Sequence, residues 1–477
     1  MKKFLEIIKK KWLIDNTKTT ILVAFLIIAF LFINIGVNKL DLQSIDITRN
    51  KLYSLSDDTK NKISELNQNV SIYFFGIDDS YTIVDLAKQY SRINDKIEVL
   101  VVDSTQRPDL YEKYEVTDSS SQGIVVQAPE RYKILSLNDL TEYDYTTSET
   151  VDVSEQKLTN AIIDTTIAKK PKIYFLSGHD ESSDMQIFQT YLANEVNEVD
   201  TLNLLSSDFP DDCDLLFISN PQKDFADYET DEIIDYINNG GNILWLSNGI
   251  DSSYINIKKI LALYGADIPK GVIRESDSNS TFASTQNYFA PTLSYHTITK
   301  SFITSNTSSP LIALFDSSKI NTVSDEELSN LNVTATPFLK SLDTSYFRTD
   351  LTNTATAATD DEETGSFNIG IEFSKQINNN NSKLVLYSDV KFATDSLTIE
   401  NKSIQPILSF YNNDLLLNTT AYLTEREDAI TIRKSTDTVS YTATDSEDFT
   451  IRLIIFIIPL IIILLGIVVW FIRRYKK

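Results

Sequence analysis

The stretch that decides the fold is KIYFLSGHDE, residues 172–181, in which an uninterrupted apolar run ends in a polar turn. Three later runs have the same form, at residues 214–219, 242–247 and 383–388. Apolar runs without alternation are typical of strands that are buried on both faces of a sheet. The four runs therefore predict the centre of a parallel sheet.

Segments with helical periodicity lie between these strands, at residues 185–196, 228–239 and 254–264, and glycines follow the last two. Alternating strands and helices predict a doubly wound parallel sheet of the flavodoxin or amidotransferase type. We expect it to fill a domain at residues 151–425. Two Ser-, Thr-, Asn- and Asp-rich segments in it, 275–310 and 343–366, are expected to be long surface loops.

A second α/β domain is predicted at residues 38–150. Its pattern is strand, helix, strand, helix and two strands, the order of a small thioredoxin-like domain. The segment has no Cys-x-x-Cys pair, so no redox role is expected.

Two long uncharged segments, residues 20–37 and 453–472, are predicted to be transmembrane helices. The flanking tails, 1–19 and 473–477, are basic, which predicts that both termini are cytoplasmic. Residues 426–452 then form a juxtamembrane segment with a short predicted strand at 429–433. The sequence thus predicts a two-pass protein of the cytoplasmic membrane whose large domain is extracellular or periplasmic.

The distribution of charge along the chain agrees with this topology, because the acidic excess lies between the two predicted spans. The chain has 43 Lys and Arg against 67 Asp and Glu, a net charge of -24, and the part between the spans carries about -32. Nucleic acid is therefore not an expected partner, because phosphate recognition needs a basic surface. One Cys and two His exclude a disulfide framework or a cysteine-based metal cluster within the chain.

The candidate ligand-binding residues follow from the predicted sheet, because ligands of such folds bind at the carboxyl ends of the strands. Each of the four strands ends in a serine, and the first serine precedes a histidine and a glutamate. The candidates are Ser177, His179, Glu181, Ser219, Ser247 and Ser388. The alternative is that each serine only forms the turn and caps the following helix.

No catalytic residue, metal site or cofactor is expected. His179 lies beside two carboxylates, as a base or metal ligand would, but adjacent residues seldom converge on one ion and His296 is the only other imidazole. Ser247 lies in a sequence similar to G-x-S-x-G, with Trp245 at the first glycine position, where a large side chain crowds the turn. Cys213 lies between two aspartates, which disfavour its thiolate. There is also no P-loop sequence.

Several segments resemble the GldG-like auxiliary subunits of ABC transport systems. The most specific is residues 46–56, DITRNKLYSLS, similar to the family's D-[LIV]-T-x-x-[KR]-x-Y-S-L-S segment. Residues 174–181, YFLSGHDE, are similar to its G-H-G-E turn, with Asp180 replacing a glycine. Residues 239–242, 388–393 and 413–418 correspond as well. The resemblance implies a membrane-anchored accessory subunit that works with a separate ATP-binding subunit and a multi-span permease.

The leading hypothesis is therefore a non-catalytic ABC-transporter auxiliary protein whose outer domain binds a partner or cargo. One alternative is a cell-envelope module that binds carbohydrate or peptide. The other is an amidotransferase-like or hydrolase-like enzyme that uses Ser247 or His179.

Overall fold

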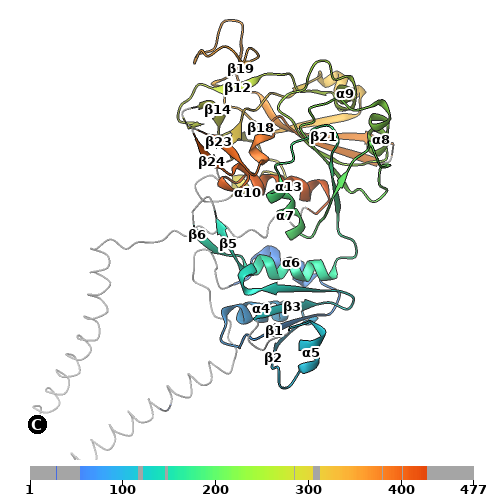
Figure 1. Cartoon of the computed structure of the whole chain (residues 1–477), viewed down its shortest axis with the longest axis vertical. Coiled ribbons are helices and arrows are strands. Elements are labelled where there is room, and N and C mark those ends of the chain that lie inside the picture. The colour runs from blue at the N-terminus through green and yellow to red at the C-terminus, as the bar shows by residue number, and fades with distance from the viewer. Residues whose placement is uncertain are drawn as a thin grey trace, which may run out of the picture.

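The computed structural model describes residues 28, 54–116, 122–144, 149–283, 285–304, 312–378, 380–399 and 401–426. Figure 1 shows a smaller and a larger α/β body stacked end to end. The predicted spans (apart from Ile28), both tails, the strand at 429–433 and the rest of the juxtamembrane segment beyond Arg426 lie outside these residues. Within the described part of the chain, no helix is both long and apolar enough to cross a membrane.

The smaller body has the element order that the sequence predicts. Its elements are α3 (Asp57–Ser64), β1 (Val70–Phe75), α4 (Thr82–Ile93), β2 (Ile97–Val102), α5 (Pro108–Lys113), β3 (Gly123–Gln127), β4 (Tyr132–Ser136), η1 (Leu137–Leu140), β5 (Thr141–Asp144), β6 (Glu149–Asp152) and α6 (Ser154–Thr166). The sheet has the order β2-β1-β3-β4, with β1 and β2 parallel and the other pairs antiparallel. Its strand β1 buries Ile72 and Phe74 against α4 and Phe75 against α5, because successive side chains point to opposite faces.

Helix α6 belongs to the core of the smaller body. Its Leu158, Ala161 and Ile162 are fully buried with β1 and β3, and Figure 1 shows α6 between this sheet and the larger body. The core of the first domain thus continues past the expected boundary at residue 150. Lys133 of β4 and Lys170 both form ion pairs with Asp164 of α6, at 2.9 and 2.5 Å.

The larger body is built on an eight-stranded sheet in the order β15-β18-β21-β22-β10-β9-β7-β8. Its strands are β7 (Lys172–Leu176), β8 (Glu198–Leu202), β9 (Leu215–Ser219), β10 (Ile243–Leu246), β15 (Thr292–Leu293), β18 (Val333–Lys340), β21 (Asn368–Ile377) and β22 (Asn380–Tyr387). The five strands from β8 to β22 are parallel. The four strands that the sequence predicts, β7, β9, β10 and β22, are neighbours at its centre.

Helices cover both faces of this sheet, which explains the uninterrupted apolar runs. Ile173 and Phe175 of β7 face α7 (Gln186–Asn194) and α13 (Asn412–Leu423). Tyr174 and Leu176 of the same strand face α8 (Asp227–Asn238) and α9 (Ile255–Ala262). A strand in such a three-layer arrangement has no solvent face, so it shows no polar alternation.

The prediction of a wholly parallel sheet is wrong for three strands. β21 pairs antiparallel with β22, β18 with β21, and β15 with β18. The direction reverses at a tight hairpin between β21 and β22, where Asn378 adopts φ 52°. Asparagine tolerates this left-handed conformation better than most residues. The sheet is therefore mixed, with an antiparallel edge.

The two segments expected to be long surface loops contain strands. Between residues 275 and 310 lie β13 (Thr281–Phe282), β14 (Thr285–Phe289), β15 and α10 (Lys300–Thr304), and between 343 and 366 lie β19 (Ser345–Arg348) and β20 (Glu363–Thr364). Polar contacts hold them: the buried Glu275 accepts a hydrogen bond from Ser345 at 2.6 Å, and the buried Arg348 forms an ion pair with Glu362. Such polar packing leaves no apolar periodicity in the sequence.

The remaining elements complete the larger body. They are β11 (Ala266–Asp267), β12 (Val272–Glu275), β16 (Leu314–Phe315), β17 (Asn321–Thr322), α11 (Asp325–Asn330), η2 (Lys391–Ala393), β23 (Leu397–Ile399), β24 (Lys402–Ile404) and α12 (Pro406–Ser409).

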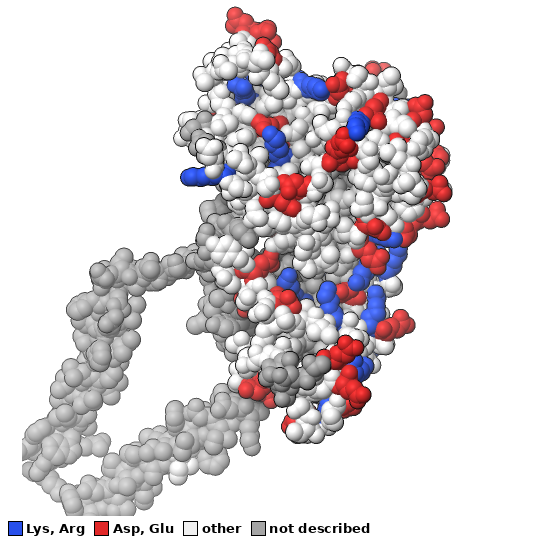
Figure 2. All heavy atoms as spheres, viewed as in Figure 1, with Lys and Arg blue, Asp and Glu red and all other residues white. Residues whose placement is uncertain are grey.

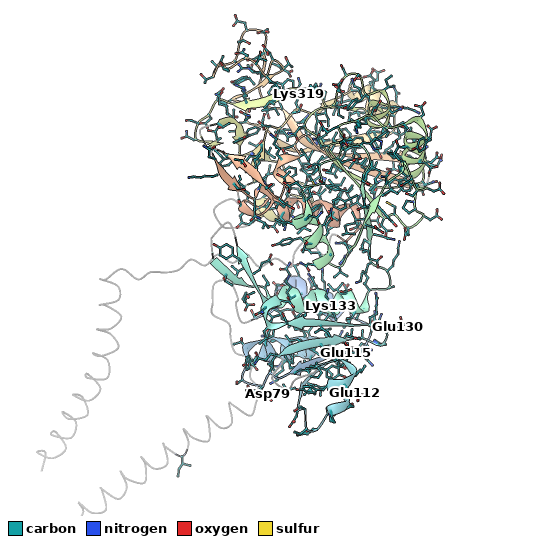
Figure 3. All side chains as sticks on the ribbon, in the orientation of Figure 1. Asp79, Glu112, Glu115, Glu130, Lys133 and Lys319 are labelled. Atoms are coloured by element: carbon teal, nitrogen blue, oxygen red, sulfur yellow. The ribbon has the colours of Figure 1, made fainter. Side chains whose placement is uncertain are left out.

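Acidic side chains are concentrated on one side of the larger body. Figure 2 shows them gathered where Figure 1 places α8 and α9. The exposed acids of α8 are Asp227, Asp231, Glu232 and Asp235. The smaller body also carries acids, among them Asp79, Glu112, Glu115 and Glu130 in Figure 3. Both bodies thus contribute to the acidic charge of the region between the predicted spans.

Candidate functional site

The carboxyl edge of the parallel strands is the candidate site, and the structure brings the four predicted serines to it. They lie at the ends of four neighbouring strands: Ser177 after β7, Ser219 in β9, Ser247 after β10 and Ser388 after β22. The strand ends are in register, since Leu246 of β10 lies opposite Ser219 on one side and Tyr387 on the other.

The four hydroxyls are used inside the protein. Their acceptors are Leu202 O for Ser177 (3.2 Å), Ser182 O for Ser219 (3.1 Å), the side-chain oxygen of Asn220 for Ser247 (3.3 Å) and Ser318 O for Ser388 (2.8 Å). Ser219, Ser247 and Ser388 are at most 3% exposed. Each hydroxyl thus donates to an oxygen of a neighbouring segment at the sheet edge, and none of the four serines is the N-cap of the helix that follows it.

The loop after β7 turns sharply and points His179 inward. Gly178 adopts φ 124° and Asp180 φ 55°, both in the left-handed region. A Cβ at Gly178 would lie 3.1 Å from the side chain of Leu205. Asp180, which stands where the resembling family has glycine, keeps the left-handed conformation and forms an ion pair with Lys223 at 2.8 Å. Asp180 thus adopts a backbone conformation that glycine usually supplies.

The imidazole of His179 is enclosed between two carboxylates. Its Nδ1 lies 3.3 Å from Glu181 Oε1 and its Nε2 lies 3.0 Å from Glu229 Oε2. The ring packs edge-on against Phe225, with centroids 4.8 Å apart, and the residue is 4% exposed. The structure therefore brings together His179 and Glu181 of the predicted set and adds Glu229 from α8.

These contacts determine the charge of His179. Burial lowers its pKa, but the hydrogen bond to Glu181 and the charge of Glu229 outweigh burial, so the net pKa is raised from the ordinary 6.5. A carboxylate at each nitrogen favours the imidazolium form, which has no lone pair to accept a proton. This arrangement disfavours His179 as a general base.

The sequence does not single out Glu229 as a site residue. It looks like one more acid on an acidic helix, yet it is fully buried, and its Oε2 also accepts a hydrogen bond from Ala226 N at 2.8 Å at the start of α8. Its Oε1 is buried and accepts no hydrogen bond from the described groups. The local signal for it was the helix start, where an acid at the third position accepts from the preceding backbone.

Two asparagines, Asn220 and Asn248, extend the hydrogen-bond network of the carboxyl edge towards β22. Asn220 adopts φ 50°, and its side-chain oxygen accepts from Asn248 N at 3.2 Å as well as from Ser247. Asn248 in turn donates to Asp316 O at 2.9 Å and accepts from Val390 N. The residues directly after the strand-ending serines thus link three loops.

Asp389, directly after Ser388, is a fully buried carboxyl group. Its Oδ2 accepts hydrogen bonds from Phe315 N at 2.6 Å and Ser317 Oγ at 2.7 Å, and its Oδ1 accepts from Phe392 N at 3.1 Å. Burial raises the pKa of Asp389 to about 7, and the three hydrogen bonds limit the rise. This group therefore titrates close to neutral pH.

Other chemistry has little support in the described residues. No three His, Cys, Asp or Glu side chains among them are arranged to hold a metal ion. Burial, together with the neighbouring aspartates, raises the pKa of the Cys213 thiol to about 12, so its nucleophilic thiolate is rare at neutral pH. Ser247 donates to an amide oxygen, which does not activate a hydroxyl as a base would.

The larger body thus belongs to the class of three-layer α/β domains, with a mixed sheet whose central strands are parallel. A family model described as "ABC-type uncharacterized transport system" matches residues 170–419, and the chain belongs to this family. The protein is thus an auxiliary component of an ABC-type transport system. The matched residues cover most of the larger body.

Comparison with curated proteins finds no match. Solved structures to which the chain is similar include the mmIFT52 N-terminal domain, with 12% identity, 53% of this chain and 97% of that chain covered, and a TM-score of 0.38. PurLQS from Thermotoga maritima has 12% identity, coverages of 54% and 100%, and a TM-score of 0.28. The exo-beta-1,4-mannosidase Op5Man5 from Opitutaceae bacterium strain TAV5 has 8% identity, coverages of 79% and 50%, and a TM-score of 0.25.

Proposed function

We propose that this protein is a non-catalytic subunit of an ABC transporter that crosses the cytoplasmic membrane twice and binds a partner or cargo with its outer domains. It works with a separate ATP-binding subunit and a multi-span permease. Family membership supports the transport context. The uncharged segments 20–37 and 453–472 and their basic flanks support the topology. The narrower GldG-like assignment is part of this proposal.

The observation that carries the non-catalytic role is the enclosure of His179. A group that transfers a proton must reach the substrate, directly or through one water. Both nitrogens of His179 instead face carboxylates of the same protein, and the residue is 4% exposed. This geometry favours a rigid scaffold over an amidotransferase-like or hydrolase-like enzyme.

Co-purification tests the assembly. The full chain with an affinity tag, extracted from its host membrane in mild detergent, is expected to bring down an ATP-binding subunit and a permease in fixed proportion. An unrelated two-pass protein with the same tag serves as the control. Recovery of the chain alone under several mild conditions would contradict the proposal.

Cysteine labelling of intact cells tests the topology. In a Cys213→Ser background, a membrane-impermeant maleimide is expected to label Ser278→Cys, an exposed position of the larger body, and to leave Lys3→Cys unlabelled until the cells are opened. Labelling of Lys3→Cys from outside would reverse the orientation and refute the model.

A further inference from the structure

Strand β18 forms a partly open edge of the large sheet. It pairs with β21 along its whole length, but with β15 only at Leu339 and Lys340. The preceding stretch, residues 333–337, has no strand beside it on the outer side among the described residues. An unpaired edge offers a row of main-chain donors and acceptors to an added strand.

The pairing with β21 determines which groups face outward. Gln376 N donates to Asn332 O at 2.9 Å, so Asn332 directs its carbonyl group towards β21, whereas its N–H donates to Ser329 O within the preceding turn. Bonded and non-bonded pairs alternate along an antiparallel ladder. Val333, Ala335 and Pro337 therefore direct their main-chain groups away from β21. The position of Pro337 agrees with this phase, because proline has no N–H to give to the ladder.

A groove of about 510 Å³ runs beside this edge. Its walls are the start of β18 and the side of α11 that carries Asp325, Leu328 and Ser329. Leu328 and Val333 are buried and form an apolar floor, whereas Thr334 and Asn332 are exposed at the rim. The volume lies in the range of ordinary ligand clefts.

The groove has an acidic side. The first turn of α11 carries Asp325, Glu326 and Glu327, all exposed. Glu327 is used locally, since its carboxylate accepts from Ser324 Oγ at 3.0 Å. Lys375 is the nearby cation, and its amino group donates to Leu331 O at 2.7 Å. Asp325, which lines the groove, thus favours a positively charged occupant.

The geometry points to residues 333–337 as the docking site of an extended segment of a partner polypeptide. The segment adds a strand beside Val333 and Ala335, places a small apolar side chain over Leu328, and turns a lysine or arginine towards Asp325. Pro337 ends the pairing, so about five residues, or roughly 16 Å of strand, are engaged. This inference goes beyond the proposed transporter assembly, because the isolated chain alone presents the edge.

Ala335→Pro is the decisive variant. It removes the outward N–H of Ala335 while sparing the ladder to β21, as Pro337 does naturally two residues later. Residue 334 is already extended, as the position before a proline requires. Ala335→Val keeps the N–H and is the matched control. Both variants of the full chain in detergent are expected to unfold within a few degrees of the wild type.

The probe is a fluorescent synthetic heptapeptide with alternating Val and Lys, followed by fluorescence anisotropy. We expect saturable binding to the wild type and to Ala335→Val, and about tenfold or greater weakening by Ala335→Pro, because one peptide carbonyl loses its donor. The same peptide with N-methylated central amides should bind equally weakly. Replacing its Lys by Glu should also weaken binding, as should Asp325→Asn with the Lys peptide.

The binding measurements test the docking site and the charge of its partner separately. No saturable binding to the wild type, or equal affinity for Ala335→Pro and Ala335→Val, overturns the docking site. Equal affinity for the Lys and Glu peptides overturns the basic partner. If Ala335→Pro does not fold, the N-methylated peptide decides, and its full affinity would overturn strand addition. Co-purification with the permease, which tests the proposed function, is independent of all these results.

Discussion

Replacing Glu229 by Gln tests the charge state of the enclosed histidine. Gln keeps the volume of the side chain, and its oxygen can still accept from Ala226 N at the start of α8. It removes the negative charge that lies 3.0 Å from His179 Nε2. An opposite charge at this distance favours the protonated ring. We therefore expect the pKa of His179 to fall in Glu229→Gln.

The same change has a pH-dependent effect on stability. The pKa of His179 is raised in the folded state, so its ion pairs stabilise the protein below the unfolded pKa of about 6.5 and are lost as the pH rises through the folded pKa. A difference of one unit between the folded and unfolded pKa corresponds to about 1.4 kcal/mol. Glu229→Gln replaces a hydrogen bond between charged groups by a neutral one, so it should cost about 1–2 kcal/mol of unfolding free energy at about pH 5.5, and less above about pH 8.

The assay uses the fact that the chain has only two histidines. In the full chain with ring-labelled histidine, NMR should show two titrations on opposite sides of pH 6.5, because burial and the charge of Lys383 lower the pKa of His296. Only the higher titration should move in Glu229→Gln, and neither should move in Asp231→Asn, an exposed acid of the same helix. A wild-type His179 that titrates below 6.5, or does not respond to Glu229→Gln, refutes the reasoning.

Three further predictions concern the neighbouring structure. The buried carboxyl of Asp389 has a pKa of about 7, so the wild type should lose stability as the pH rises from about 4 to 7, and Asp389→Asn should not show this loss. Chemical denaturation at several pH values measures the free energy of unfolding. Identical pH profiles for the two proteins would contradict the prediction. Glu362→Gln should lower the free energy of unfolding by about 3 kcal/mol, because Arg348 is left buried without its anionic partner. Limited proteolysis should then cut within residues 343–366. Unchanged resistance to the protease would contradict the role of the ion pair. Gly249→Ala should lower the free energy of unfolding by about 1–3 kcal/mol, because the φ of Gly249 is 109° and the new Cβ would lie 3.0 Å from Pro269 O. Gly365→Ala is the control: its φ is 132° but its Cβ would meet nothing within 4 Å, so this variant measures backbone strain without the clash.

The central strands and their helices could be predicted because both faces of the sheet are covered. Apolar periodicity predicts a helix at residues 228–239, and the structure has α8 at Asp227–Asn238. The antiparallel strands could not be assigned in this way. The direction of β21 depends on a hairpin at Asn378 in an asparagine-rich run, and the apolar pattern of a strand does not specify whether it pairs parallel or antiparallel.

The candidate site could be predicted only in part, because some of its contacts depend on how distant segments pack. The serines and His179 follow strands, so their meeting at one edge follows from the fold. Glu229 lies 50 residues from His179, and only the packing of α8 brings the two within 3.0 Å. Asp389 was visible as part of a Ser-Asp pair, but its burial depends on loop 315–317, whose backbone and hydroxyl donors surround it.

The reversal of strand direction changes which part of the sheet offers a surface. An all-parallel sheet binds ligands at its carboxyl edge, and here serine, asparagine and aspartate side chains form hydrogen bonds with one another and with the backbone along that edge. The hairpin that joins β21 to β22 adds antiparallel strands and places β18 at the border of the sheet. Main-chain groups of Val333 and Ala335 then face a groove with an acidic rim. The departure from the predicted topology thus creates the surface to which we assign the docking of a partner strand.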